Sequence, residues 1–245
     1  MQLNLRCQQL VQDEEGYATW RVQNVVGQWP AEKTALLLCD VWNSHWCRGA
    51  VARLDAMVER MEQVVRTVRD AGGLIVHAPS DTMDFYADSP ARKRAGAVPQ
   101  LDPPPDQERA DPPLPIDASD NGSDTGETET HKAWHRQHQA IGIDEERDII
   151  ADEGIEIYSY LQHARIEHLL IMGVHTNMCV LHRTFAIKQM VRWGAEVALI
   201  RDLTDAMYNP AMPPYVSHDE GTRLVIEFIE KFWCSSVESG DILEV

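Results

Sequence analysis

Short runs of consecutive apolar residues alternate along this chain with longer segments in which apolar residues recur every three to four positions. Continuous apolar runs bounded by polar residues or glycine are typical of strands buried on both faces of a parallel sheet. Such runs lie at 34–39, 74–78, 169–174 and 195–200. The helical spacing predicts helices at 51–70, 181–193 and about 218–232. The segment 155–158 fits either a strand or the start of a helix that continues through Leu161.

This alternation predicts a doubly wound, Rossmann-like α/β domain, with a mostly parallel sheet between two layers of helices. The unit from 34 to 78 is a strand, a helix and a second strand, which implies a right-handed crossover. We expect this domain to cover residues 34–245. Residues 1–33, with short alternating segments, are expected to form a small β appendage or an arm that contacts another subunit. A proline-rich, acidic insertion at about 85–130 has no periodicity and predicts a linker, a lid or an ordered excursion.

The composition of the chain disfavours some classes of binding partner. The chain has 245 residues and a formal net charge of −17, which opposes binding to nucleic acid or to an anionic membrane. No apolar run reaches the 18 residues of a membrane span, and the polar N-terminus does not resemble a signal peptide. Five cysteines without regular spacing favour a reducing compartment. We therefore expect a cytoplasmic protein that acts on a small molecule.

The octapeptide Gly173–Val180 carries the strongest chemical signal, because it joins a predicted buried strand to a predicted helix. Cys179 then lies in the first turn of that helix, where unpaired N–H groups and the helix dipole favour a thiolate. A cysteine nucleophile is one interpretation, and a small buried hydrophobic residue is the other.

Two further residues lie where reactive groups gather in a parallel sheet, beyond the carboxyl ends of the strands. Asp40 follows the first predicted strand and could accept the proton of the Cys179 thiol. Lys132 follows the proline-rich tract and could lower the pKa of the thiol and keep the carboxylate ionised. The spacing of Asp40, Lys132 and Cys179 along the chain does not by itself show that they form one site.

Four segments of the chain resemble the isochorismatase-like cysteine hydrolases, a family that includes nicotinamidases and other small-amide amidohydrolases. They are Leu36–Asn43, Thr130–Lys132, Gly173–Val180 and Arg201–Ala206. The resemblance covers most of 34–232, and its most specific element is Gly-Val-x-Thr-x-x-Cys-Val with an upstream apolar-Asp-x-x-Asn. Lys132 lies 92 residues after Asp40, a long separation that the insertion explains.

The resemblance implies a mechanism in which Asp40 deprotonates Cys179 and the thiolate attacks an amide-type carbonyl. It implies that backbone N–H groups of Cys179 and His175 hold the oxyanion, with a cis peptide bond between Val174 and His175. Residues that flank the implied base and lysine would line the substrate pocket: Asn43, His45, Trp46, Trp134 and His135, with Trp42 as a further candidate. The tryptophans could instead cover the edge of the core or a subunit contact. A homodimer or homotetramer is also implied.

The chain departs from the nicotinamidases at the Asp-x-His metal triplet, which is replaced by His77–Asp81. We therefore expect no metal and no cofactor, and we expect His45 and His77 to pack or hydrogen-bond rather than ligate. The segment Asp117–Gly122 resembles the start of a calcium loop, but Thr128 stands where the bidentate glutamate is due. An acidic solvated loop is the better interpretation.

Other functions remain open. Within the family, vinyl-ether hydrolysis of isochorismate does not need the cysteine. From other classes, the chain could be a catalytically silent binding or assembly module, or a redox sensor that uses Cys179. A nucleotide-binding Rossmann domain is disfavoured, because no Gly-x-Gly-x-x-Gly follows the first strand.

Four polar residues near these segments receive structural interpretations. Arg183, with its neighbour His182, is expected to face solvent or a subunit interface. Asp202 and Asp205 are expected to serve as turn and cap residues.

Overall fold

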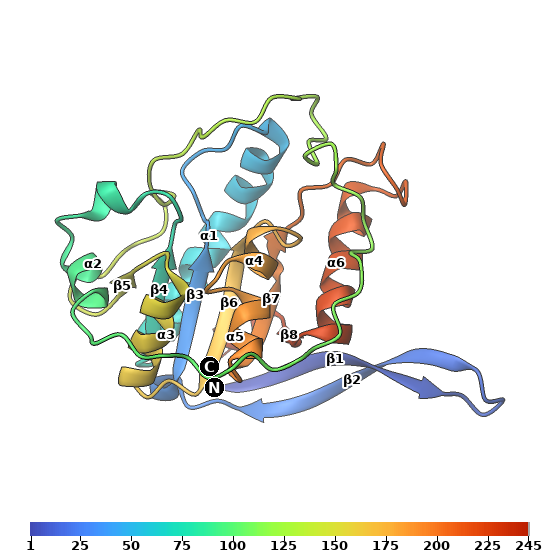
Figure 1. Cartoon of the computed structure of the whole chain (residues 1–245), viewed down its shortest axis with the longest axis horizontal. Helices are drawn as coiled ribbons and strands as arrows, with labels where there is room; N and C mark the ends of the chain where they lie inside the picture. The colour runs from blue at the N-terminus through green and yellow to red at the C-terminus, as the bar shows by residue number, and fades with distance from the viewer. Residues whose placement is uncertain (245) are drawn as a thin grey trace.

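The computed structural model describes residues 1–244, and it contains one eight-stranded sheet (Figure 1). The strands are β1 (Gln2–Gln12), β2 (Ala18–Gln28), β3 (Thr34–Cys39), β4 (Leu74–Ala78), β5 (Ile149–Ile150), β6 (His168–Val174), β7 (Glu196–Asp205) and β8 (Ser235–Val237). Their order across the sheet is β2-β1-β8-β7-β6-β3-β4-β5. The strands from β8 to β5 run parallel, whereas β1 pairs antiparallel with both β2 and β8. The prediction of a mostly parallel α/β sheet is confirmed.

Helices cover both faces of the sheet. They are α1 (Arg48–Asp70), α2 (Pro90–Ala95), α3 (Gly154–His163), α4 (Cys179–His182), α5 (Ile187–Arg192), α6 (His218–Phe232) and α7 (Ser239–Leu243), with 3-10 turns at Ala31–Lys33 and Met83–Tyr86. Alternate residues of β3 point to opposite faces, as strand geometry requires. Leu37 packs with residues of α3, α5 and α6, whereas Leu36 and Leu38 pack with residues of α1 and α7. The result is the expected three-layer α/β/α arrangement. No helix among residues 1–244 is long and apolar enough to cross a membrane.

The first 28 residues form a long hairpin of β1 and β2, in agreement with the predicted β appendage. Figure 1 shows this hairpin extending beyond the body of the molecule. Its inner strand joins the main sheet where Arg6 pairs with Ser236 of β8. Leu3 is fully buried in the core beneath α1 and α7, so the base of the hairpin is part of the domain's packing.

The proline-rich segment 97–130, called the strap below, contains no helix or strand but makes specific contacts along its length. Backbone N–H groups of the strap donate to Ser159 Oγ on α3 and to the carbonyl oxygens of Arg192 and Pro213. Near its end, the strap residue Thr125 accepts a hydrogen bond from Gly49 at the start of α1, at 3.2 Å. The expected insertion at about 85–130 begins with helix α2, and only its later part, residues 97–130, is an ordered excursion around the molecule (Figure 1).

Several elements differ from their sequence-based predictions. The ambiguous segment 155–158 belongs to helix α3. The helix expected over 181–193 is divided into α4 and α5, because Arg183 has an extended backbone (φ −58°, ψ 150°) that cannot continue the helix. Strand β7 extends to Asp205, beyond the predicted end at 200, and the short elements α2, β5, β8 and α7 were not predicted. Short elements carry too few residues to show a period.

The central strands approach each other closely at Gly173 of β6. Its φ of +126° is a conformation that side chains rarely adopt, and an added Cβ would lie 2.0 Å from the carbonyl oxygen of Cys39 on β3. The position therefore requires glycine, and it fixes the separation of the two strand ends that carry the candidate site.

We predict that Gly173→Ala lowers the free energy of unfolding by about 3 kcal/mol or more, because backbone atoms must move apart. Gly126→Ala is the matched control: this glycine also has a positive φ, of +91°, but nothing lies within 4 Å of the added Cβ. It should cost only about 1 kcal/mol. Urea denaturation of both variants measures the difference, and equal costs would contradict the close approach.

Candidate active site

Asp40 is the first residue after β3 and is completely buried. Its backbone N–H donates to the carbonyl oxygen of Ala78 at 3.0 Å, which continues the contact between β3 and β4. One carboxylate oxygen, Oδ1, accepts the backbone N–H of Ser80 at 2.8 Å. The other, Oδ2, accepts Nε of Arg183 at 3.0 Å. The carboxylate is thus oriented by groups that follow β4 and α4.

Cys179 reaches the same place from the neighbouring strand. β6 ends at Val174, and the peptide bond from Val174 to His175 is cis, as the resemblance implied. A tight turn then leads to Cys179, the first residue of α4. The Cys179 thiol lies within interaction distance of the carboxylate of Asp40, and the backbone N–H of His175 faces the sulfur. The structure therefore brings Asp40 and Cys179 together, as their positions after adjacent strands predicted.

The electrostatics of this pair favour a neutral thiol beside an ionisable carboxylate. Burial raises the pKa of Asp40 above its usual value, and the cation of Arg183 opposes that rise. Burial and the neighbouring charge of Asp40 raise the pKa of Cys179 to about 12. The expectation that the helix terminus makes Cys179 a thiolate is therefore wrong for the resting state, because burial outweighs a helix of four residues. A reaction at Cys179 must include transfer of its proton to a base.

Among residues 1–244, Lys132 forms no ion pair with Asp40. Its side chain is exposed, and its ammonium donates to the backbone carbonyl oxygen of Asp81. The cation that contacts Asp40 is Arg183, whose Nη2 also lies 3.6 Å from Oδ2 of Asp81. Arg183 was expected to face solvent or an interface, and that expectation is wrong. The missed signal is its spacing of four residues from Cys179, which places two side chains on one side of a helical turn.

An aromatic stack lies beside the carboxylate, formed by three of the expected pocket residues. The rings of Trp42 and Trp134 are stacked with their centroids 3.9 Å apart. His45 lies parallel to Trp134 at 5.7 Å and meets Trp46 at 5.1 Å. The indole nitrogen of Trp134 is buried and has no hydrogen-bond partner within residues 1–244. Trp42 and Trp134 therefore pack against each other next to the loop that follows Asp40.

Asn43 joins the two segments that carry this stack. Its Oδ1 accepts the backbone N–H groups of His135 and Arg136 at 3.1 and 3.2 Å, and its Nδ2 lies 3.2 Å from Nδ1 of His135. Asn43 and His135 thereby hold the 131–136 segment against the loop after β3. Their observed contacts are with each other and with backbone, so they shape the site.

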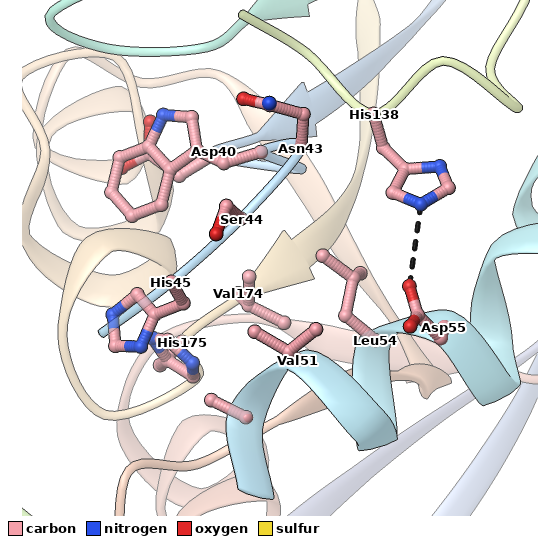
Figure 2. Close-up of a pocket in the computed structure, with 12 residues that line it drawn as sticks. Asp40, Asn43, Ser44, His45, Val51, Leu54, Asp55, His138, Val174 and His175 are labelled. Carbon is pink, nitrogen blue, oxygen red and sulfur yellow. Dashed lines mark ion pairs between the residues drawn. The ribbon is translucent and has the colours of Figure 1, made fainter. Parts of the chain in front are cut away.

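A narrow cavity with room for about one water molecule adjoins Asp40 (Figure 2). Its lining includes Val174, His45 and His175, and Figure 2 shows the two imidazole rings close together. Their centroids are 4.9 Å apart. Burial, followed by the neighbouring His131, lowers the pKa of His45 to about 4, and burial followed by His45 lowers the pKa of His175 to about 3. Both rings are neutral at pH 7.

The candidate metal positions carry hydrogen bonds to protein groups. His77 is buried between Gln137 Oε1 at 2.9 Å and Asp148 Oδ2 at 3.0 Å. In the calcium-like segment, Asp117 and Asp120 accept backbone N–H groups of their own loop. Within residues 1–244, no three His, Cys, Asp or Glu side chains are grouped so as to hold a metal ion.

The two aspartates near the end of β7 hold neighbouring elements. Asp202 accepts the backbone N–H of Ser239 at the start of α7, at 2.8 Å. Asp205 is buried and pairs with Nε of Arg53 and with Nε2 of His218, both at 2.8 Å. Asp205 therefore ties α1 and α6 to the strand end beside Val174, a larger structural role than the expected turn or cap.

Comparison with known proteins supports the same fold. A model of the isochorismatase domain matches residues 34–211. A cysteine hydrolase from Pseudomonas syringae pv. phaseolicola 1448A is similar in structure, with a TM-score of 0.57, 15% identity, and coverage of 89% of this chain and 94% of that one. A putative isochorismatase hydrolase from Oleispira antarctica has a TM-score of 0.53 and 15% identity, with coverage of 89% and 100%. No curated protein matches the chain.

The family model spans well over half of the chain and includes both Asp40 and Cys179. The structural relatives, at about 15% identity, agree in fold. This chain belongs to the isochorismatase family of hydrolases.

Proposed function

We propose that this chain is a cysteine hydrolase that cleaves a small amide or a related C–N bond through a thioester on Cys179. The observation that carries the proposal is the proximity of the Cys179 thiol to the buried carboxylate of Asp40, whose charge acts directly on it. A nucleophile in contact with a base that is itself oriented by other groups is the arrangement that covalent catalysis requires. Here Ser80 and Arg183 orient the base.

The chemistry follows from the protonation states. As the sulfur of Cys179 attacks the carbonyl carbon, its proton passes to Asp40, and the carbonyl electrons move onto oxygen. When the tetrahedral intermediate collapses, the C–N bond breaks and Asp40 returns the proton to the leaving amine. Asp40 then takes a proton from water as the water attacks the thioester, and the C–S bond breaks to release the acid and the neutral thiol. Burial aids this cycle, because it raises the pKa of Asp40 and makes the carboxylate a better base.

The oxyanion in this cycle would be held by the backbone N–H groups of His175 and Cys179. The His175 N–H already faces the sulfur, and Cys179 is at the N-terminus of a helical turn. Donors that are fixed before the reaction stabilise developing charge without reorganisation. The neutral side chains of His45 and His175 add no charge at the mouth of this region at pH 7.

The substrate proposed for this site is small and has a flat face. The parallel rings of Trp42, Trp134 and His45 offer planar apolar surfaces next to Asp40. Such surfaces favour stacking together with a small number of oriented hydrogen bonds. The buried, unpartnered N–H of Trp134 is one donor available for such a bond.

We predict that the wild-type protein releases ammonia from at least one member of a panel of small primary amides and ureido compounds. Cys179→Ala should abolish the release, because no thioester can form. Cys234→Ala, which removes a thiol distant in sequence from the site, is the control and should leave the release unchanged. Ammonia release that survives in Cys179→Ala would contradict the mechanism. Turnover of a vinyl ether but of no amide would support the alternative within the family.

The pH dependence of kcat/KM should report Asp40 as the base. A carboxyl whose pKa is raised takes up its proton at a higher pH than usual, so activity should fall on acidification at a pH above the ordinary aspartate value near 4. Asp40→Asn should lower kcat/KM by about 10²-fold or more, and it should abolish the fall in activity at low pH. If Asp40→Asn keeps both the wild-type kcat/KM and its fall at low pH, another group is the base.

We also propose that the chain forms a homo-oligomer through the free edge of β2. This strand has eleven residues, lies at the edge of the sheet and contains one arginine and no acidic residue, in a chain with 39 acids. Exposed apolar side chains lie on β2 and on its partner β1: Trp20, Val22, Val25 and Val26 on β2, and Leu10 on β1. A second copy fits this edge best, because two antiparallel β2 strands related by a two-fold axis pair their unsatisfied backbone groups where charge repulsion is least.

Light scattering after size-exclusion chromatography tests this assembly. The double variant Val22→Lys/Val26→Lys should convert a dimer or larger oligomer into a smaller species, because it places like charges opposite each other. Tyr17→Lys, at an exposed position outside both strands, is the control and should leave the mass unchanged. A monomeric wild-type protein, or a double variant with unchanged mass, would contradict the proposal.

A further inference from the structure

We propose that Arg183 is the positioning and charge-balancing cation of the Asp40–Cys179 pair, the role that the resemblance assigned to Lys132. This inference rests on the proposed function, since it concerns the same base and nucleophile. It goes further by assigning the third member of the site to a residue that the family motif does not mark.

The contact between Arg183 and Asp40 is direct and serves a buried charge. Nε of Arg183 lies 3.0 Å from Oδ2 of Asp40, and the carboxylate is completely buried. A buried carboxylate is costly unless it is paired and hydrogen-bonded. Of its two oxygens, one is bound by the Ser80 N–H and the other by this guanidinium. Arg183 is the cation whose charge acts on both Asp40 and Cys179.

The backbone places Arg183 and the nucleophile on one short turn. The N–H of Arg183 donates to the carbonyl oxygen of Cys179 at 3.0 Å, which closes α4. The chain then turns away from the helix, and Thr184 Oγ1 accepts the N–H of Gly154 at the start of α3. The position of the cation relative to the sulfur is therefore fixed by local geometry, whereas Lys132 is exposed on a separate loop.

The charged groups around the pair come from four segments. Cys39 and Asp40 are at the end of β3, Asp81 follows β4, and Cys179 and Arg183 belong to the α4 turn. Lys132, on the fourth segment, contacts the backbone oxygen of Asp81 rather than either reacting group. Arg183 is consequently the cation placed to favour the ionised forms of both the carboxyl and the thiol.

An arginine in this position takes no part in proton transfer. Guanidinium keeps its proton at every pH at which the protein is folded, and Asp40 and Cys179 raise the pKa of Arg183 further. Arg183 therefore holds charge without exchanging protons, and Asp40 alone carries protons between the thiol, the leaving group and water.

The test is the alkylation of Cys179 by iodoacetamide, followed by mass spectrometry of the peptide that contains it, from pH 6 to pH 10. This readout needs no substrate. Arg183→Gln should slow alkylation at pH 8 by about tenfold or more, because the loss of an adjacent opposite charge disfavours the thiolate. Arg183→Lys keeps the charge and should restore most of the rate. Lys132→Gln should leave the pH profile of alkylation at its wild-type position.

The outcomes separate the two proposals. A Lys132→Gln variant that slows alkylation while Arg183→Gln does not would overturn the assignment to Arg183. Failure of Arg183→Lys to improve on Arg183→Gln would also overturn it, since a purely structural role would not depend on the charge. If instead Cys179→Ala still releases ammonia, the thioester mechanism fails whatever the alkylation result. Circular dichroism of each variant confirms that it is folded before the rates are compared.

Discussion

The burial of one carboxylate, that of Asp40, is the constraint on which the site depends. The carboxylate lies where β3 ends between β4 and β6, and the residue is completely buried. Every group that satisfies it arrives from another element: the Ser80 N–H from the loop after β4, and the Arg183 guanidinium and Cys179 thiol from the turn after β6. The fold is arranged so that these groups meet.

Burial also determines how the nucleophile is used. It raises the pKa of both members of the pair, so the resting site holds a neutral thiol next to a carboxylate that is more basic than usual. In the proposed mechanism, proton transfer from the thiol to the carboxylate accompanies attack, and no exposed thiolate has to be maintained. Such a thiol is protected from oxidation at rest, because the thiolate is the form that oxidants attack. This argues for the hydrolase proposal and against a redox sensor.

The aromatic stack near Asp40 is assembled from segments far apart in the chain. Trp42 and Asn43 follow β3, whereas Trp134 and His135 lie beyond the strap, some ninety residues later. Stacking of the two indoles and the amide of Asn43 hold them together. The strap makes this possible, because its contacts with α3, α5 and the start of α1 return the chain to the active-site end of the sheet.

The sequence by itself determined the class of fold and the proximity of Asp40 and Cys179. Continuous apolar runs identified β3, β4 and β6, and the 3.6-residue period identified α6 with both of its ends. Because parallel strands end at one edge, Asp40 and Cys179 could be placed together from their positions after two strands. Only the tertiary structure decided that Arg183, and not Lys132, pairs with Asp40, and that the Cys179 thiol is protonated at rest. Periodicity reflects neighbours along the chain, whereas ion pairing and desolvation depend on distances across it.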